Sequence, residues 1–158
     1  MKIPAKVERF LSAAKAKYES IEHRTVYTAY DKAATLKVPE KIIGKTLVLK
    51  IDSGYALALI PANKNLDKNK LRKTAKAKKV DFVKEAWMRK NLKGMKIGAV
   101  PPFGNLFKVK TFVDTVLLNN PKIIVGSGVH EISIKIAPGT LKKIVPDLIV
   151  GSFSAAKK

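Results

Sequence analysis

The first forty residues have the spacing typical of two helices and one short strand. Apolar residues recur every three or four positions at the start of the chain, where Pro4 suits a first helical turn. Polar and apolar positions partly alternate over residues 24–29, which predicts a short strand. Asp31 can then cap a second helix that runs to Leu36 and ends before Pro39. The residues that define the first helix are Val7, Phe10, Leu11, Ala14 and Tyr18.

The clearest pattern in the chain is that of a β-hairpin. Residues 45–51 and 55–60 are apolar and rich in β-forming residues, and the turn sequence Asp-Ser-Gly at 52–54 separates them. Pro61 ends the second run. Because both runs are almost continuously apolar, we expect them to be central strands of a sheet.

A basic segment follows this hairpin. Residues 64–96 hold 13 Lys or Arg and 3 Asp or Glu, which gives a net charge of +10, half of the total. The pattern predicts one helix near residues 66–78 and a second helix that Asp81 caps. We expect Phe82 and Trp87 to pack in the core rather than to stack on bases.

Short apolar runs return in the last third of the chain and predict further strands. Turns at residues 119–121 and 126–128 separate them, and Pro138 opens a short helix that runs to Val145. We expect the tail from Ser152 to be loose. Strands and helices in this order predict the α/β class, with one mixed sheet of about six strands and helices packed against it. The expected strands are residues 112–118, 122–125 and 131–136.

Composition narrows the chemistry that the chain can perform. Its 158 residues are the size of one domain, and they include no cysteine and two histidines, His23 and His130. These counts exclude thiol catalysis, disulfides and cysteine-bound zinc, and they argue against a multi-histidine metal site. We therefore expect no metal and no cofactor. Residues 1–17 lack the apolar run of a secretory signal, and no run approaches 18 apolar residues, so we expect a soluble, cytoplasmic protein without a membrane partner.

The net charge is the most unusual property of the sequence. Thirty-two Lys and Arg against 12 Asp and Glu give +20, which favours polyanionic partners, of which nucleic acid is the commonest. An acidic membrane surface ranks lower, because no amphipathic helix carries bulky apolar anchors beside its lysines. The basic segment 64–96 can neutralise phosphates, although a solvated helical face is the alternative. The candidates for tRNA phosphate contacts are Lys68, Lys70, Arg72, Lys73, Lys76, Lys78 and Lys79.

Two short motifs do not match the enzymes that they suggest. Residues 44–46 (Gly-Lys-Thr) lack the first glycine of a phosphate-binding P-loop, since position 39 is proline, and a strand follows them where a P-loop continues into a helix. Residues 126–128 (Gly-Ser-Gly) lack the spacing of a nucleophile elbow, because Val125 and Val129 stand where that motif needs glycines. Neither a nucleoside triphosphatase nor a serine hydrolase is favoured.

A stiff loop, a lysine and a histidine are the best candidates for a site. Residues 98–104 (GAVPPFG) combine two glycines with two prolines, so free backbone N–H groups there can hold a carbonyl oxygen or an oxyanion; a tight surface turn is the alternative. Lys45 stands at the start of an apolar strand, where a snorkelling side chain at a sheet edge is the alternative. His130 follows a glycine turn and can equally be a hydrogen-bonded structural residue.

Three segments of the chain carry a family resemblance. They are residues 27–50 (YTAYDKAATLKVPEKIIGKTLVLK), 98–104 (GAVPPFG) and 112–144 (FVDTVLLNNPKIIVGSGVHEISIKIAPGTLKKI). In this order, over residues 20–147, they resemble the YbaK/prolyl-tRNA editing family. The resemblance implies a single YbaK-like domain over residues 1–158 with a curved mixed sheet. It also implies trans-editing, the hydrolysis of the ester of mischarged aminoacyl-tRNA without a cofactor.

The resemblance also implies roles for individual residues. Lys45 would be catalytic beside the ester and the terminal phosphate, and Gly98 would be catalytic in the loop that positions the ester. The implied substrate is tRNA for proline carrying a small wrong amino acid such as alanine or cysteine, with serine and threonine also open, and prolyl-tRNA synthetase is an implied partner. The alternative is a non-catalytic tRNA- or RNA-binding module on the same fold. The implied substrate-binding residues are Thr28, Thr46, Ala99, Val100, Pro101, Pro102, Gly104, Ser127, Gly128 and His130.

Overall fold

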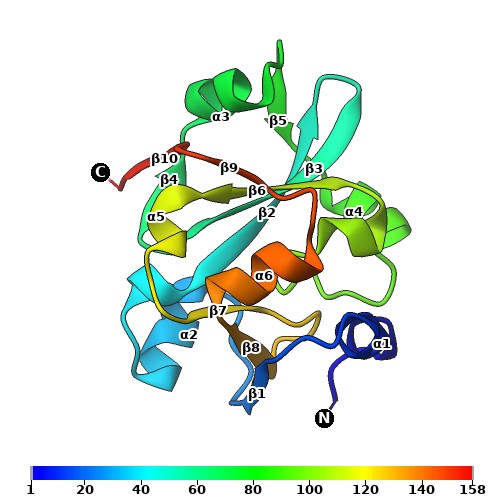
Figure 1. Ribbon diagram of the computed structural model, residues 1–158, viewed down its shortest axis with the longest axis vertical. Helices are drawn as coiled ribbons and strands as arrows, with labels where there is room; N and C mark the ends of the chain where they lie inside the picture. Colours follow the sequence, from blue (N-terminus) through cyan, green and yellow to red (C-terminus); the bar gives the residue numbers. More distant parts are fainter. Residues whose placement is uncertain (1, 158) are drawn as a thin grey trace.

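The computed structural model describes residues 2–157, and Figure 1 shows their helices and strands. The α/β class is confirmed. None of the helices described within this range is long and apolar enough to cross a membrane. The helices are α1 (Ala5–Ala13), α2 (Ala29–Leu36), η1 (Glu40–Ile42), α3 (Lys68–Ala75), α4 (Glu85–Asn91), η2 (Gly104–Phe107), α5 (Thr115–Leu118) and α6 (Pro138–Ile144). The strands are β1 (Glu19–Glu22), β2 (Gly44–Ile51), β3 (Gly54–Pro61), β4 (Lys64–Leu66), β5 (Val80–Phe82), β6 (Lys110–Asp114), β7 (Ile123–Gly126), β8 (Ile132–Ile136), β9 (Ile149–Gly151) and β10 (Ser154–Ala156).

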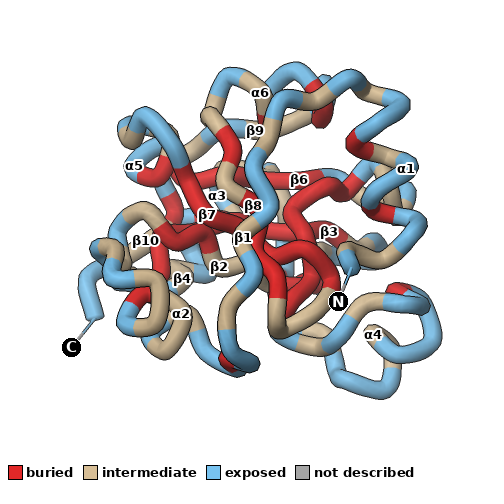
Figure 2. The backbone as a smooth tube through the Cα atoms, turned by 90° about the horizontal axis from the view of Figure 1, so that it is seen from below, coloured by how far each residue is buried: buried red, intermediate tan, exposed pale blue. Residues whose placement is uncertain are grey.

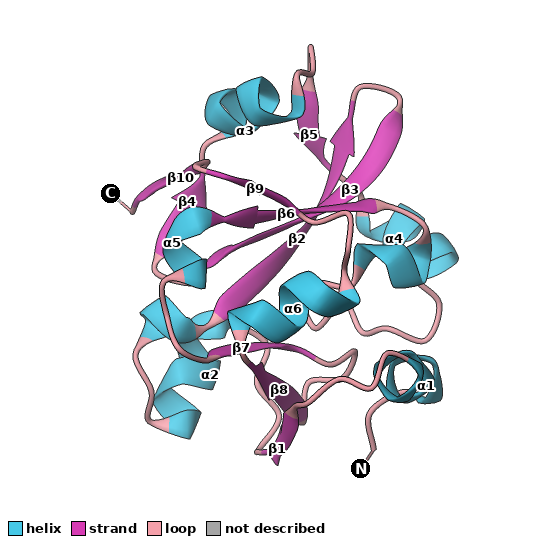
Figure 3. Ribbon diagram, in the orientation of Figure 1, coloured by secondary structure: helices cyan, strands magenta, loops and turns pink. Residues whose placement is uncertain are grey.

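The strands form three hydrogen-bonded sheets where we expected one. The central sheet has five strands in the order β5-β2-β3-β6-β9, in which β2 is antiparallel to its neighbours and β6 is parallel to its own (Figure 3). An antiparallel sheet contains β1, β8 and β7, and β4 pairs with β10. A parallel bridge between Ile43 and Ile124 joins the first two sheets. This bridge brings the beginning of β2 next to β7.

Apolar side chains of the strands form the core. Figure 2 shows the buried parts of the chain running through the middle of the molecule, with exposed residues mainly on the helices and loops around it. In the largest cluster, Val7 and Leu11 of α1 pack with Leu141 of α6 and with Ile134 and Ile136 of β8. The two helices thus cover the three-stranded sheet. A second cluster lies under α3 and fixes the far end of the central sheet.

The chain before α2 is not the predicted strand. Strand β1 comes earlier, and its last residue, Glu22, pairs with Ile132, the first residue of β8, so residues 24–29 have no strand beside them in this ladder. The following residues enter α2 as a loop. The Thr28 hydroxyl caps this helix by accepting a hydrogen bond from the Asp31 N–H at 3.0 Å, whereas Asp31 was the predicted cap.

Three other predicted boundaries also move, and an aspartate lies at each of them. Asp81 does not cap a helix but lies in β5, which pairs with the end of β2, and α4 begins only at Glu85. Asp67 caps α3 by accepting from the Lys70 N–H, so this helix begins at Lys68. The strand predicted for residues 112–118 ends at Asp114, whose carboxylate caps α5.

The tail is not loose over the residues that the structure describes. Strand β10 pairs antiparallel with β4, and Phe153 is completely buried in the cluster under α3. The Asp114 carboxylate also accepts hydrogen bonds from the N–H groups of Phe153 and Ser154, each at 2.9 Å. These contacts fix the path of the chain up to Lys157.

The two aromatic residues of the basic segment lie in different environments. Trp87 is partly buried and stacks on Tyr55, with 4.0 Å between ring centroids. Phe82 is 55% exposed, and the Lys68 ammonium lies 5.0 Å from its ring centroid. The prediction that Phe82 packs in the core is wrong, because β5 is an edge strand with one face open to solvent.

Candidate active site

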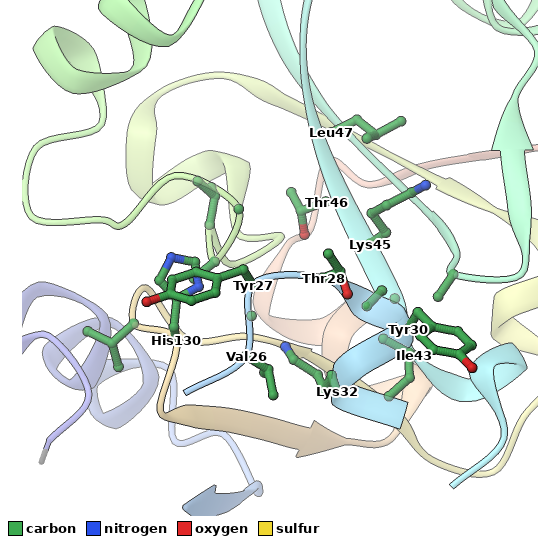
Figure 4. Close-up of a pocket in the computed structure, with 18 of the residues that line it drawn as sticks. Val26, Tyr27, Thr28, Tyr30, Lys32, Ile43, Lys45, Thr46, Leu47 and His130 are labelled. Atoms are coloured by element: carbon green, nitrogen blue, oxygen red, sulfur yellow. The ribbon is translucent and has the colours of Figure 1, made fainter. Parts of the chain in front are cut away.

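A cavity of about 420 Å³ opens between α2, the beginning of β2, the loop at residues 98–100 and the turn before β8 (Figure 4). It brings together residues that are far apart in the sequence. Seven of the predicted site residues line it: Thr28, Lys45, Thr46, Gly98, Ala99, Val100 and His130. Both predicted catalytic residues, Lys45 and Gly98, therefore line the same cavity.

Lys45 reaches the cavity because β2 passes very close to its neighbours at Gly44. A Cβ atom on Gly44 would lie 2.8 Å from Leu59 Cδ1 and 3.2 Å from Val125 Cγ1, so a larger residue would require these side chains to shift. The next residue then enters the cavity wall. Burial lowers the pKa of Lys45 below its ordinary value, and the nearby positive charge of Lys157 lowers it further, against a smaller opposing effect of Glu40.

The loop at residues 98–100 rests on the glycine turn that follows β7. Gly98 has a φ of +88°, which favours glycine, and the Ala99 carbonyl accepts a hydrogen bond from the Gly128 N–H at 2.7 Å. The Ala99 N–H donates to the Lys96 carbonyl. Within residues 2–157, the N–H groups of Gly98 and Val100 donate to no protein acceptor, and both residues line the cavity.

Two hydroxyl groups of the cavity differ in their hydrogen bonding. The Thr28 hydroxyl caps α2 and is thereby held in place. The Thr46 hydroxyl is buried and has no hydrogen-bond partner among the described residues, although it lines the cavity. A buried hydroxyl without a partner costs about 1–3 kcal/mol.

His130 lies beside Gly98 at one side of the cavity. Its ring makes an edge-to-face contact with Tyr27, with 4.9 Å between centroids and an interplanar angle of 60°. Its Cε1 atom is 3.5 Å from the position that a Cβ atom on Gly98 would occupy. The imidazole is therefore positioned by packing.

Five of the predicted substrate-binding residues do not line the cavity. Pro101 and Pro102 are buried beyond the loop. Gly104 packs on β6, where its N–H donates to the Thr111 hydroxyl at 2.8 Å. The Ser127 hydroxyl donates to the Ile132 carbonyl at 2.6 Å, and Gly128 packs against Pro4 and Met95. These residues shape the walls behind the site instead of facing a ligand.

Two further lysines line the cavity and were missed by the sequence reasoning. Lys32 projects from α2, and burial lowers its pKa to about 8. Lys32 shares the inner face of the helix with Ala29, Ala33 and Leu36, and this helical spacing could have identified it from the sequence. Lys157 follows β10, and its placement depends on the pairing of that strand with β4. The sequence pattern gives no sign of that pairing.

The predicted phosphate contacts are not part of the cavity. Lys68, Lys70, Arg72 and Lys73 belong to α3, and Lys76, Lys78 and Lys79 follow it. Figure 1 shows α3 and α2 at opposite ends of β2. Eight residues of strand correspond to about 25 Å. A phosphate that binds this basic cluster would therefore lie well away from the cavity.

The arrangement of charges suits an anionic or polarised oxygen. Lys32, Lys45 and Lys157 line the cavity, and no Asp or Glu is among the lining residues of the described chain. Within residues 2–157, no group of three or more His, Asp or Glu side chains could hold a metal ion. Lysine ammonium groups and two unpaired N–H groups are donors that stabilise negative charge developing on a carbonyl oxygen.

The fold and this cavity define a YbaK-like α/β domain with a cationic binding site. The family model of the aminoacyl-tRNA editing domain matches residues 23–144. The chain belongs to this family.

Relatives with known names or structures agree with this assignment. A proline–tRNA ligase of Fervidobacterium nodosum is 31% identical over 108 residues, which make up 68% of this chain and 18% of that enzyme. The chain thus spans less than a fifth of the length of this relative. A crystal structure of a hypothetical protein gives a TM-score of 0.85 at 26% identity, over 94% of this chain and 99% of the other. A protein proposed as a trans-editing enzyme for prolyl tRNA synthetase gives 0.82 at 20% identity, over 100% and 99%, which shows the common fold.

Proposed function

We propose that this domain hydrolyses the ester bond of mischarged aminoacyl-tRNA. The observation that carries the proposal is the convergence of Lys45 and the loop at residues 98–100 on one cavity. The proposed substrate is tRNA for proline that carries a small wrong amino acid such as alanine or cysteine. The relation to a proline–tRNA ligase supports this choice of tRNA and prolyl-tRNA synthetase as a partner.

The proposed reaction needs little chemistry from side chains, because an aminoacyl ester is already activated. A water oxygen attacks the ester carbonyl carbon, the bond between this carbon and the ribose oxygen breaks, and the products are a free amino acid and a ribose hydroxyl. The neighbouring ribose hydroxyl can help to move the proton, as the family resemblance implies. The protein then has to position the water and stabilise the oxyanion.

The cavity offers donors for this oxyanion. The N–H groups of Gly98 and Val100 and the ammonium of Lys45 can hydrogen-bond to the carbonyl oxygen as its negative charge grows. Each well-placed donor contributes about 3–4 kcal/mol to the lowering of such a barrier. Two or three donors account for a large rate enhancement without a nucleophilic side chain.

A hydrolytic site separate from the charging site would also add discrimination between similar amino acids. One methylene or hydroxyl group changes binding by only about 1–3 kcal/mol, which is too little for accurate charging of tRNA by binding alone. A cavity of about 420 Å³ has the size of a small-molecule site, and it would admit a small aminoacyl group with the terminal adenosine. We therefore expect hydrolysis to be fastest for small amino acids.

A deacylation panel tests this proposal. The protein is incubated with tRNA for proline charged with alanine, cysteine, serine, threonine or proline, and loss of the ester is followed. We expect at least one small amino acid to be released well above the spontaneous rate, with prolyl-tRNA largely spared. Binding of these tRNAs without hydrolysis would instead support a non-catalytic tRNA-binding module.

Lys45→Ala tests the role of the site in the same assay. We expect the rate to fall at least 100-fold, because the variant removes a cation that faces the carbonyl oxygen. Lys50→Ala is the matched control, since Lys50 lies on the same strand but is exposed at its far end. Circular dichroism and thermal unfolding of both variants check that the fold is intact. An unchanged rate for Lys45→Ala would remove Lys45 from the catalytic site.

A further inference from the structure

Two tyrosines at the opening of the cavity are unusually exposed. Tyr27 is 70% exposed and Tyr30 is 67% exposed. Each ring therefore leaves a large apolar surface in contact with water. Both residues line the cavity, one just before α2 and one in its first turn. Figure 4 shows their rings on opposite sides of Thr28, so that an aromatic surface stands at each side of this segment.

The backbone that carries these rings is held in place. The Thr28 hydroxyl caps α2 between them, and the Val26 N–H donates to the His130 carbonyl. The Tyr27 ring also rests on the His130 ring at 4.9 Å. An aromatic side chain that is already oriented loses little conformational entropy when a ligand stacks on it.

The charge around the tyrosines indicates what kind of ligand would use them. Lys32, Lys45 and Lys157 line the same cavity, without a lining carboxylate among the described residues. Aromatic rings beside a cationic groove are the combination with which proteins bind single-stranded nucleic acid, because bases stack on the rings while cations contact the phosphates.

We propose that Tyr27 and Tyr30 form a stacking platform for the unpaired nucleotides that precede the terminal adenosine of tRNA. The inference rests on the proposed function, which places the terminal aminoacyl adenosine inside the cavity. A cavity of about 420 Å³ has the volume of one such group, so the preceding nucleotides must leave through the opening. The exposed rings stand at this opening and stack on bases of any sequence.

The test uses uncharged RNA, so that binding is measured without hydrolysis. One RNA hairpin carries an unpaired 3′ tail that ends in CCA, and a second hairpin has the same duplex with a blunt end. Wild type should bind the tailed hairpin more tightly. Tyr27→Ala and Tyr30→Ala should each weaken binding of the tailed hairpin by about 5- to 100-fold, the range expected for one stacked base, and should change binding of the blunt hairpin less than about 2-fold. Tyr27→Phe and Tyr30→Phe keep the ring and should bind like wild type.

Phe82→Ala is the aromatic control, because Phe82 is also exposed but lies near α3. It should change binding of both hairpins by the same factor. The platform is refuted if wild type binds the two hairpins equally, or if the alanine variants weaken both equally. It is also refuted if the phenylalanine variants lose as much affinity as the alanine variants. A tail effect that depends on the tyrosines, in a protein that releases no amino acid, would keep the platform and refute the proposed hydrolysis.

Discussion

Lys32 occupies an unfavourable position for a lysine. Its side chain is largely buried, its pKa is lowered to about 8 by desolvation, and it forms no ion pair within residues 2–157. The difference from the ordinary value of 10.5 corresponds to a cost of at most about 3 kcal/mol for keeping the ammonium charged in the folded protein. A cost of this kind is typical of functional sites.

Lys32→Met should therefore stabilise the protein and impair its activity. Because the pKa of Lys32 is lower in the folded state than in the unfolded state, the unfolded state binds more protons between about pH 8 and 10.5, and folding becomes more favourable as pH rises through this range. The free energy of unfolding of the variant should exceed that of wild type by up to about 3 kcal/mol at pH 7, and the gain should shrink toward pH 10.5. Urea unfolding at several pH values measures this difference.

Lys41→Met is a suitable control for that experiment, since Lys41 is an exposed lysine in η1. It should change stability by less than about 0.5 kcal/mol. Deacylation by Lys32→Met should fall, because the cavity loses one of its three cations. A variant that is less stable than wild type, or whose gain is the same at every pH, would show that the Lys32 ammonium is not desolvated.

At the scale of elements, the site depends on how closely the loop at residues 98–100 approaches β7. Gly126 ends this strand and lines the cavity. A Cβ atom at Gly126 would lie 2.6 Å from the Ala99 carbonyl oxygen and 2.8 Å from that of Val100. Both neighbours are backbone atoms, which can yield only if the loop moves.

Gly126→Ala should displace the loop and reduce both stability and activity. We expect a loss of about 1–3 kcal/mol in the free energy of unfolding, as for other insertions into a packed region. Deacylation should fall at least tenfold, because a shift of about 1 Å in a positioning group can cost about 100-fold in rate. Gly139→Ala is the control, since no atom lies within 4 Å of the added Cβ in α6, and it should be neutral or slightly stabilising. Full activity in Gly126→Ala would show that catalysis does not depend on the position of the loop at residues 98–100.

Elements with local signals were predictable from the sequence, and elements with distant partners were not. The hairpin of β2 and β3 has its turn and both strands within 18 consecutive residues, and Pro138 marks the start of α6. By contrast, β1 and β10 form only because β8 and β4 offer free edges more than 80 residues away. The pattern of apolar and polar residues in such a short segment does not indicate a pairing strand that lies far away in the sequence.

The same distinction explains which site residues were found. Lys45 and Gly98 have recognisable neighbours in the sequence and carry the family resemblance, and both line the cavity. Lys157 reaches it only because the completely buried Phe153 and the pairing of β10 fix the tail. Ser127 and Gly128 lie close to His130 in sequence, but their hydrogen bonds and packing direct them into the walls behind the site.

For the molecule as a whole, the net charge of +20 includes two basic regions that could contact a polyanion. Lysines of the cavity lie at one end of β2, whereas the N–H groups of Lys78 and Lys79, after α3, donate to Asp52 just beyond the other end of that strand (Figure 1). A tRNA whose 3′ end enters the cavity could contact the basic cluster with the part of the molecule that precedes this end. Contacts there would be made to phosphates, which add affinity without reading sequence.

Charge reversal on α3 tests whether this cluster contacts tRNA or only adds to the overall field. Lys70→Glu/Lys73→Glu changes two exposed lysines on one face of the helix, and Lys142→Glu/Lys143→Glu changes two exposed lysines of α6, so both double variants lower the net charge by four. If α3 contacts two phosphates, the first variant should make the plot of log affinity against log salt shallower by about 1.4 to 1.8, since each contact contributes about 0.7–0.9. The second variant should weaken binding less and leave this slope nearly unchanged. Equal effects of the two variants would mean that tRNA responds only to the total charge, and that α3 is a solvated face.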